Sequence, residues 1–185
     1  MTASVRSRRL ENEWALLRRL VAHNGGILEG VRREVQPEGD VFHVILHRTS
    51  ALALEQPPSL MAVASHTVSF RYPAYYPSVP IEAFLATPVF HPNVHPENGF
   101  VCLWSRSSVG DTILEAAGQL QRIITWQLWN DRAEHVMQPE ALQWTPNLTL
   151  PLSCDPLCIP DDLQLERTYA RKPEGSRRRL SAGSL

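Results

Sequence analysis

The chain is most tightly constrained by the stretch from His91 to Trp104, which reads HPNVHPENGFVCLW. Its two X-Pro steps keep the backbone extended or turned and cannot continue a helix. Asn98-Gly99 is a strong tight-turn dipeptide, because Gly, and less readily Asn, tolerates a positive φ. Cys102 follows this turn three residues later. A thiol on a loop that prolines fix in place has the build of a nucleophile on a rigid platform.

Two further segments extend this pattern along the chain. Residues 70–80, FRYPAYYPSVP, read as a strand followed by a Tyr-Pro-x-x-Pro turn, and residues 131–144 contain the segment QPEA. The order of these features resembles the active-site region of the ubiquitin-conjugating enzymes: the Tyr-Pro-x-x-Pro turn, the His-Pro-Asn motif at 91–93, the Asn-Gly turn and then the cysteine. The resemblance covers roughly residues 5–145 and is most specific over 70–104.

The resemblance implies an α+β, UBC-like fold: an N-terminal helix, a four-stranded antiparallel meander, the active-site loop, a packed helix and a short C-terminal helical segment. It also implies a transferase that takes ubiquitin or a ubiquitin-like modifier from an activating enzyme as a thioester on Cys102 and passes it to a lysine of a target. Cysteine suits both steps, because thiolate is a good nucleophile and thiol a good leaving group. No metal or other cofactor is expected.

Two residues of the motif take roles from the same resemblance. Asn93 matches the family's asparagine, which stabilises the carbonyl oxygen during transfer or holds the loop that does so. His91 matches a histidine that braces the loop by hydrogen bonds, and we expect it to take no part in proton transfer.

The sequence leaves open which residue assists the incoming amine. The family places an acidic residue four positions before the Pro-Glu of the post-catalytic segment, and this count arrives at His135. Glu134 lies beside it and Asp131 is near. A neutral imidazole can accept a proton, so His135 is one candidate. An offset of one residue in the alignment gives the role to Glu134 instead.

The chain also departs from the family's pattern. The step from Asn93 to Cys102 is one residue longer than usual, with the extra residue at His95-Pro96. Ile81 replaces the second proline of the common Pro-Pro pair, which leaves the cis turn there open. The loop after Cys102 is short, and we expect the terminal helices of standard eukaryotic members to be missing. These departures indicate a divergent branch, such as the bacterial homologues from ubiquitin-like modification operons that serve antiphage defence.

The N-terminal region predicts an amphipathic helix over residues 5–23. Asn24-Gly25-Gly26 is a typical helix end. Its apolar residues recur at helical spacing, at Leu10, Trp14, Leu17, Leu20 and Val21. Its arginines fall mostly outside this stripe and are expected to stay in water, at Arg6, Arg8, Arg9, Arg18 and Arg19. Because the family meets its activating enzyme with a basic first helix, Arg6, Arg8 and Arg9 are docking candidates.

The region that follows changes to the pattern of strands. Val68, Phe70 and Tyr72 alternate with polar residues, which is the signal of a half-buried antiparallel strand. Short turns between consecutive runs imply a meander. The strands are predicted at residues 27–35, 41–47, 60–72 and 81–87.

A second helix is predicted after the cysteine loop. Thr112 followed by Glu115 fits a capping box. Residues 139–144 are expected to form a short closing helix. The buried stripe of the second helix is predicted at Ile113, Ala117, Leu120, Ile124 and Leu128.

Composition sets the outer limits. With 185 residues, 43% of them hydrophobic, the chain has the length and apolar content of one domain with a real core. We place a UBC-like catalytic domain at 1–145 and a proline-containing tail, partly disordered from about 170, at 146–185. A formal net charge of −1 gives no field that favours nucleic acid, and no window has the length of a membrane span.

The three cysteines make no disulfide framework, which indicates reduced thiols and a cytoplasmic location. Cys154 and Cys158 are a single C-x3-C pair without the second pair that a structural zinc site needs.

The sequence offers two alternatives to a thioester carrier. A catalytically inactive UBC-like binding module is disfavoured, because the cysteine stands at the expected place. A cysteine hydrolase would need His91 or His135 within hydrogen-bond reach of the sulfur of Cys102. No arginine or lysine directly flanks Cys102, which fits a carrier better than a low-pKa nucleophile.

Overall fold

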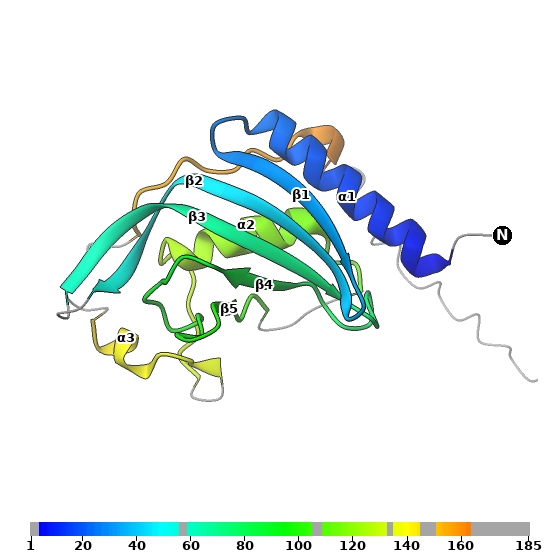
Figure 1. Ribbon diagram of the computed structural model, residues 1–185. Helices are drawn as coiled ribbons and strands as arrows, with labels where there is room; N and C mark the ends of the chain where they lie inside the picture. Colours follow the sequence, from blue (N-terminus) through cyan, green and yellow to red (C-terminus); the bar gives the residue numbers. More distant parts are fainter. Residues whose placement is uncertain (1–3, 56–58, 105–108, 133–134, 145–150, 164–185) are drawn as a thin grey trace, which may run out of the picture.

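The computed structural model describes residues 4–55, 59–104, 109–132, 135–144 and 151–163 (Figure 1). In chain order the elements are α1 (Val5–His23), β1 (Leu28–Gln36), β2 (Gly39–Glu55), β3 (Ser59–Pro73), β4 (Glu82–Leu85), β5 (Phe100–Val101), α2 (Ile113–Ile124) and α3 (Pro139–Trp144). The helices predicted at 5–23 and 139–144 are confirmed at these bounds. A search of the described residues finds no helix with the length and apolar character to cross a membrane.

The strands form an antiparallel meander in the order β1-β2-β3-β4-β5. The α+β class and the meander are therefore confirmed, but the prediction of four strands was wrong. The fifth strand, β5, pairs with β4 through Ala83↔Val101 and Phe84↔Phe100. It is two residues long, too short for an alternation of side chains to reveal it in sequence.

The predicted bounds of β2 and β4 were also wrong. β2 was expected at 41–47 but runs on to Glu55. Its pairing with β3 is irregular between His47 and Ala51 and resumes beyond that point. Arg48 lies at this irregularity with a φ of 50°. Such a bulge breaks the two-residue period and hides the continuation of the strand. β4 is shorter than predicted, at Glu82–Leu85 instead of 81–87.

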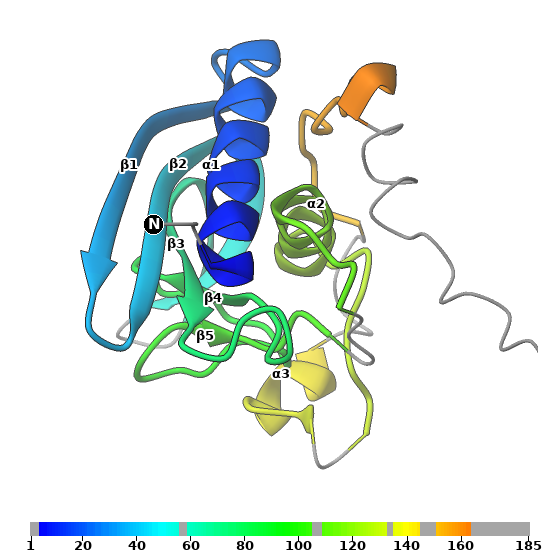
Figure 2. The same cartoon turned by 90° about the vertical axis from the view of Figure 1, so that its right-hand side faces the viewer.

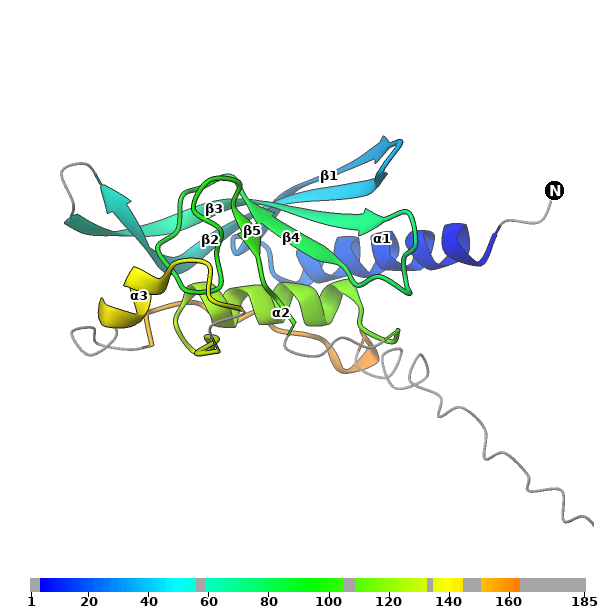
Figure 3. The ribbon, with the colours of Figure 1, turned by 90° about the horizontal axis from the view of Figure 1, so that it is seen from below.

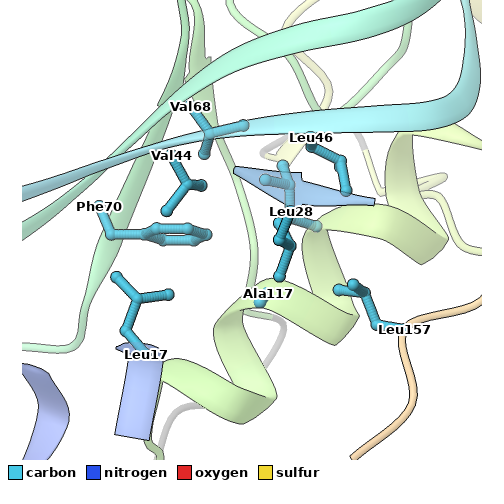
Figure 4. Close-up of a pocket in the computed structure, with 9 residues that line it drawn as sticks. Leu17, Leu28, Val44, Leu46, Val68, Phe70, Ala117 and Leu157 are labelled. Atoms are coloured by element: carbon cyan, nitrogen blue, oxygen red, sulfur yellow. The ribbon is translucent and has the colours of Figure 1, made fainter. Parts of the chain in front are cut away.

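Both long helices lie on one face of the sheet (Figures 2 and 3). Alternate residues of β2 are buried toward them, at Phe42, Val44 and Leu46, and β3 buries Val68, Phe70 and Tyr72 in the same way. Between the sheet and the helices there remains a cavity of about 10 Å³ (Figure 4). This is about the smallest space that holds one water molecule, so the interior offers no ligand site there.

The first helix buries its predicted stripe but also a charged group. Leu10, Leu17 and Leu20 are buried, and Glu13 beside them is 1% exposed. The Glu13 carboxylate accepts hydrogen bonds from Arg9 Nε at 2.9 Å, from the Tyr76 hydroxyl at 2.8 Å and from the backbone N–H of Ile113 at 2.7 Å. Ile113 is the first residue of α2, so one buried carboxylate ties the two helices together.

The expectation that the N-terminal arginines stay in water was wrong for two of them. Arg9 is half-buried and bonded to Glu13 and Tyr76. Arg6 is half-buried, 3.4 Å from a carboxylate oxygen of Asp40. Both residues lie near the apolar stripe on the surface of the helix, so their long aliphatic side chains can reach partners elsewhere in the domain. Arg8 is exposed, as expected.

The second helix begins with the predicted capping box, in which the backbone N–H of Thr112 donates to Glu115 at 2.9 Å. The stripe is buried at Ile113, Ala117, Leu120 and Ile124. Leu128 was expected to continue it but lies beyond the helix end, partly buried against the same core. Trp126 takes a left-handed φ of 58° just after the helix, and its ring packs against the ring of His91.

The Tyr-Pro-x-x-Pro segment forms a turn whose Tyr76–Pro77 peptide bond is cis. Among the described residues no other peptide bond is cis, so the bond between Pro80 and Ile81 is trans. The question that the sequence left open at Ile81 is thereby answered.

Residues 151–163 of the predicted tail lie along α2 (Figure 3). The backbone of Thr49 forms an antiparallel bridge with Cys154, and Gln121 Nε2 donates to the carbonyl of Asp155 at 2.9 Å. Cys158 N donates to Asn24 Oδ1 at 2.7 Å, and Leu163 is 1% exposed. The division into 1–145 and 146–185 stays a prediction, with 145–150 and 164–185 outside the described residues.

Candidate active site

The loop before Cys102 is closed by a compact set of turn hydrogen bonds. The N–H of His95 donates to the carbonyl of Phe100 at 2.8 Å, and the N–H of Gly99 donates to the carbonyl of His95 at 3.0 Å. The Asn98 side chain accepts the N–H of Phe100 at 2.9 Å. Gly99 has a φ of 69°, and a Cβ there would collide with the Leu85 carbonyl oxygen. The predicted Asn-Gly turn is confirmed, and it directs the chain into β5.

Cys102 directly follows β5 and lies between two segments of the chain. Its backbone N–H donates to the carbonyl of Asn93 at 2.8 Å, which joins it to the His-Pro-Asn motif. Its thiol is half-buried. On the other side, Nδ2 of Asn130 lies 3.6 Å from Sγ, and the thiol faces the carbonyl of Trp104 at 4.0 Å. The sulfur is therefore held in place yet partly open to solvent.

Burial raises the pKa of the Cys102 thiol above its ordinary value, while the hydrogen bond from Asn130 and the contact with Trp104 oppose that rise. Cys102 is accordingly a neutral thiol near pH 7. Such a sulfur is a poor nucleophile toward an unactivated amide. It still exchanges with a thioester, whose thiol leaving group is good.

Asn93 clamps the loop with both ends of its buried amide. Its Nδ2 donates to the carbonyl of Cys102 at 3.0 Å, and its Oδ1 accepts the backbone N–H of Asn130 at 2.8 Å. The resemblance left two roles open for this residue, oxyanion stabilisation and loop support. The two bonds favour loop support, because they occupy the amide with backbone groups on either side of the sulfur.

His91 is fully buried beneath the same loop. Its Nδ1 accepts the backbone N–H of Asn93 at 3.1 Å, and its ring lies 4.5 Å from the ring of Trp126, centroid to centroid. Burial lowers the pKa of His91 to about 3, against an opposing interaction with the backbone of Leu128. The ring is therefore neutral at physiological pH, with its proton on Nε2. This geometry fits the predicted bracing role.

The segment after α2 holds the His-Pro-Asn loop from below. The N–H of Met137 donates to the carbonyl of Pro92 at 2.7 Å. The buried amide of Gln138 donates from Nε2 to two carbonyls of the loop, Val89 at 2.9 Å and Val94 at 2.8 Å. Among the described residues, Gln138 is the hydrogen-bond donor that satisfies these two buried carbonyls.

The candidates for assisting an incoming amine lie on this same segment. Asp131 is exposed and adjoins Asn130. His135 is half-buried, and its N–H donates to the carbonyl of Arg132 at 2.9 Å in a short turn. Glu134 lies outside the described residues. The choice among Asp131, Glu134 and His135 therefore stays a prediction.

The hydrolase alternative lacks the contact that it requires. Within the described residues, the hydrogen bonds of Cys102 Sγ join it to Asn130 and Trp104 and none reaches an imidazole. His91 directs Nδ1 at the backbone of Asn93 instead. In the same part of the chain, no three His, Cys, Asp or Glu side chains are placed to hold a metal ion.

Sequence reasoning missed two residues of this site, Asn130 and Gln138. Both sit in a segment that the sequence marked only as polar or as family-like, and amides at such positions give no periodic signal. The Gln-Pro-Glu tripeptide did locate the segment. The tripeptide does not predict where the Gln138 side chain points, because that direction depends on how this segment packs against the His-Pro-Asn loop.

Comparisons with known proteins bear on the fold. No family model matches the chain, and no curated protein matches its sequence. A solved structure from Trypanosoma cruzi, described by name as a ubiquitin conjugating enzyme, matches with a TM-score of 0.50 and 15% sequence identity, over 80% of this chain and 94% of that one. The chain has a UBC-like fold. At 15% identity the match supports the fold alone.

Proposed function

We propose that this protein is a conjugating enzyme for ubiquitin or a ubiquitin-like protein, with Cys102 as the thioester carrier. The observation that carries the proposal is the place of Cys102. It follows β5 and sits between the His-Pro-Asn loop and the segment after α2, with its sulfur partly open to solvent. A UBC-like fold that holds a cysteine in this setting has the part that a carrier needs and that an inactive binding module lacks.

The first step is an exchange of thioesters. Sγ of Cys102 attacks the carbonyl carbon of the modifier, which arrives as a thioester on the activating enzyme. The new S–C bond forms, the bond to the donor's sulfur breaks, and that sulfur leaves as a thiolate and takes up the proton that Cys102 gave up. No strong activation of Cys102 is needed, because one thioester replaces another of similar energy.

The second step transfers the modifier to an amine of the target. The lysine nitrogen attacks the carbonyl carbon, an isopeptide bond forms, and the C–S bond to Cys102 breaks. The proton lost by the amine passes to Asp131, Glu134, His135 or solvent. Asn93, His91 and Gln138 hold the loop so that the carbonyl meets the amine in one geometry.

The partners follow from this chemistry: a ubiquitin-like modifier, its activating enzyme and a protein target. For the activating enzyme, the basic N-terminal helix remains our docking candidate. Of the three candidate arginines, Arg8 is exposed, whereas Arg6 and Arg9 already bind groups of this chain. We place the reaction in the cytoplasm, where thiols stay reduced, and in a bacterial modification operon of the antiphage type. An adjacent activating enzyme, ubiquitin-like protein and JAB-type peptidase in the genome would support that placement.

A charging assay tests the proposal. The chain is incubated with ATP and with the activating enzyme and modifier taken from its gene neighbourhood, and the products are separated on non-reducing gels. We expect a thiol-sensitive adduct on the wild type that Cys102→Ala abolishes. Cys154→Ala and Cys158→Ala are the matched controls, since these thiols lie outside the site. An adduct that survives Cys102→Ala would move the chemistry to another cysteine. Failure of every variant to charge, with partners proven active, would favour a binding module.

A further inference from the structure

We infer that Asn130, and not Asn93, supplies the amide hydrogen-bond donor to the reacting centre at Cys102. The inference rests on the proposed carrier function and deepens it. Nδ2 of Asn130 lies 3.6 Å from Sγ, within the distance that a hydrogen bond to sulfur spans. Among the described residues it is the side-chain donor that reaches the sulfur.

The side-chain amide of Asn93 is already occupied by hydrogen bonds to the backbone. It joins the carbonyl of Cys102 through Nδ2 and the backbone N–H of Asn130 through Oδ1. Turning it toward a substrate would break both bonds and leave a partly buried carbonyl and a partly buried N–H without these partners. Asn93 is itself 3% exposed, so its side chain has little water with which to replace those bonds.

Asn130, by contrast, is held by its backbone and free to act with its side chain. Its N–H is fixed to Asn93 Oδ1 at 2.8 Å, which holds its backbone in place while Nδ2 faces the sulfur. The residue is half-buried, so a substrate bound on Cys102 can reach its amide. Donors fixed in advance act most strongly, because they need no reorganisation when charge develops.

An amide donor at this position can act in both stages of the transfer. In the thioester, the carbonyl oxygen is two bonds from Sγ, and Nδ2 of Asn130 lies 3.6 Å from that sulfur, so the oxygen can come within its reach. When an amine attacks, that oxygen takes negative charge and the donor stabilises it. When the tetrahedral intermediate collapses, the C–S bond breaks and its electron pair goes to Sγ. The same N–H then stabilises the departing thiolate, which finally takes up a proton from solvent.

The test uses the full chain, with Cys154 and Cys158 changed to serine so that Cys102 is the reactive thiol. The chain is charged chemically with the mercaptoethanesulfonate thioester of N-acetyl-glycyl-glycine, and the acyl adduct is followed by intact mass spectrometry after free lysine is added. We expect Asn130→Ala to charge but to lose the acyl group to lysine about 100-fold more slowly than the parent chain, which keeps Asn130. Asn130→Asp, which keeps the shape but lacks the donor and adds a negative charge beside the developing oxyanion, should be at least as slow.

Two further measurements separate chemistry from structure. The pH profile of Cys102 alkylation by iodoacetamide should shift to higher pH in Asn130→Ala, because a donor to the thiolate is lost. The matched control is Gln127→Ala, which removes a similar amide that lies 3.7 Å from the sulfur of residue 154 in the unmodified chain. It should change neither aminolysis nor the profile.

The outcomes are distinct. Lysine transfer at equal rates in the parent and in both Asn130 variants overturns the role of Asn130 and leaves the carrier function intact. A parent chain that iodoacetamide alkylates at Cys102 but that accepts no acyl group there counts against the carrier function itself, and the role of Asn130 falls with it. If Asn130→Ala does not fold, Asn130→Asp decides the same comparison.

Discussion

Protonation of His91 should weaken the fold as the pH falls. In the folded chain the ring is buried against Trp126 and accepts the N–H of Asn93, and burial lowers its pKa from 6.5 to about 3. In the unfolded chain the ring binds a proton near its ordinary pKa. The unfolded state therefore takes up a proton first, and the stability contributed by the neutral ring, fully present above pH 6.5, is lost progressively as the pH falls toward 3.

The size of the effect follows from the two pKa values. Between pH 7.5 and pH 5 the folded ring stays neutral while almost all of the unfolded rings become charged, which lowers the free energy of unfolding by about 2 kcal/mol. The full difference, reached only near pH 3, is about twice as large.

The variant that isolates this effect is His91→Asn. Its side-chain oxygen can take the place of Nδ1 as acceptor for the N–H of Asn93, but it does not titrate. The variant loses the ring contact with Trp126, so it should be less stable at every pH; the pH dependence is what matters. His66 is also buried with a lowered pKa, and it is present in both proteins, so its contribution cancels.

The assay is urea unfolding of wild type and His91→Asn at pH 7.5 and at pH 5. We expect the wild type to lose about 2 kcal/mol more than the variant between the two conditions. Equal losses in the two proteins would refute the reasoning, because they would mean that the folded ring binds a proton as readily as the unfolded one. That result would also reopen a proton-transfer role for His91.

Two other substitutions test the support of the loop. Gly99→Ala should destabilise the fold by at least about 2 kcal/mol, because alanine is strained at the φ of 69° and its Cβ meets the Leu85 carbonyl. Thermal unfolding measures this, with Gly118→Ala as control: a Cβ there meets nothing within 4 Å, so it should be neutral or stabilising, and equal effects of the two changes would contradict the argument. Gln138→Ala should cost about 2–3 kcal/mol, because it leaves two buried carbonyls unpaired. It should also speed hydrogen exchange in the loop, whereas the exposed Gln143→Ala on α3 should do neither.

The regular elements could be predicted because their signals are local. Helix periodicity located α1, and the Thr112–Glu115 pair located the start of α2, since capping depends on residues close in sequence. Alternation located β3 for the same reason. The two-residue β5 and the extension of β2 past Arg48 escaped, because a strand is defined by its partner and a bulge interrupts the alternation.

The partners of the charged residues of α1 could not be predicted from the sequence either. A helical wheel places Arg6 and Arg9 beside the apolar stripe, and from sequence alone both belong in water. Their actual partners, Asp40 and Glu13 with Tyr76, include groups that the chain reaches only after the sheet has formed. Burial of Glu13 is likewise set by the N-terminus of α2, a hundred residues away in sequence.

By itself, the sequence determined the order of the elements other than β5, the tight turn at Gly99 and the stretch of chain in which the thiol lies. These depend on φ preferences, proline and periodicity, which act over a few residues. The tertiary structure alone decided what surrounds the sulfur: the amide of Asn130 beside it, the clamp of Asn93 and the buried Gln138 beneath the loop. Those contacts join β5, the His-Pro-Asn loop and the segment after α2. Side-chain direction between distant segments is fixed only when the segments pack against one another.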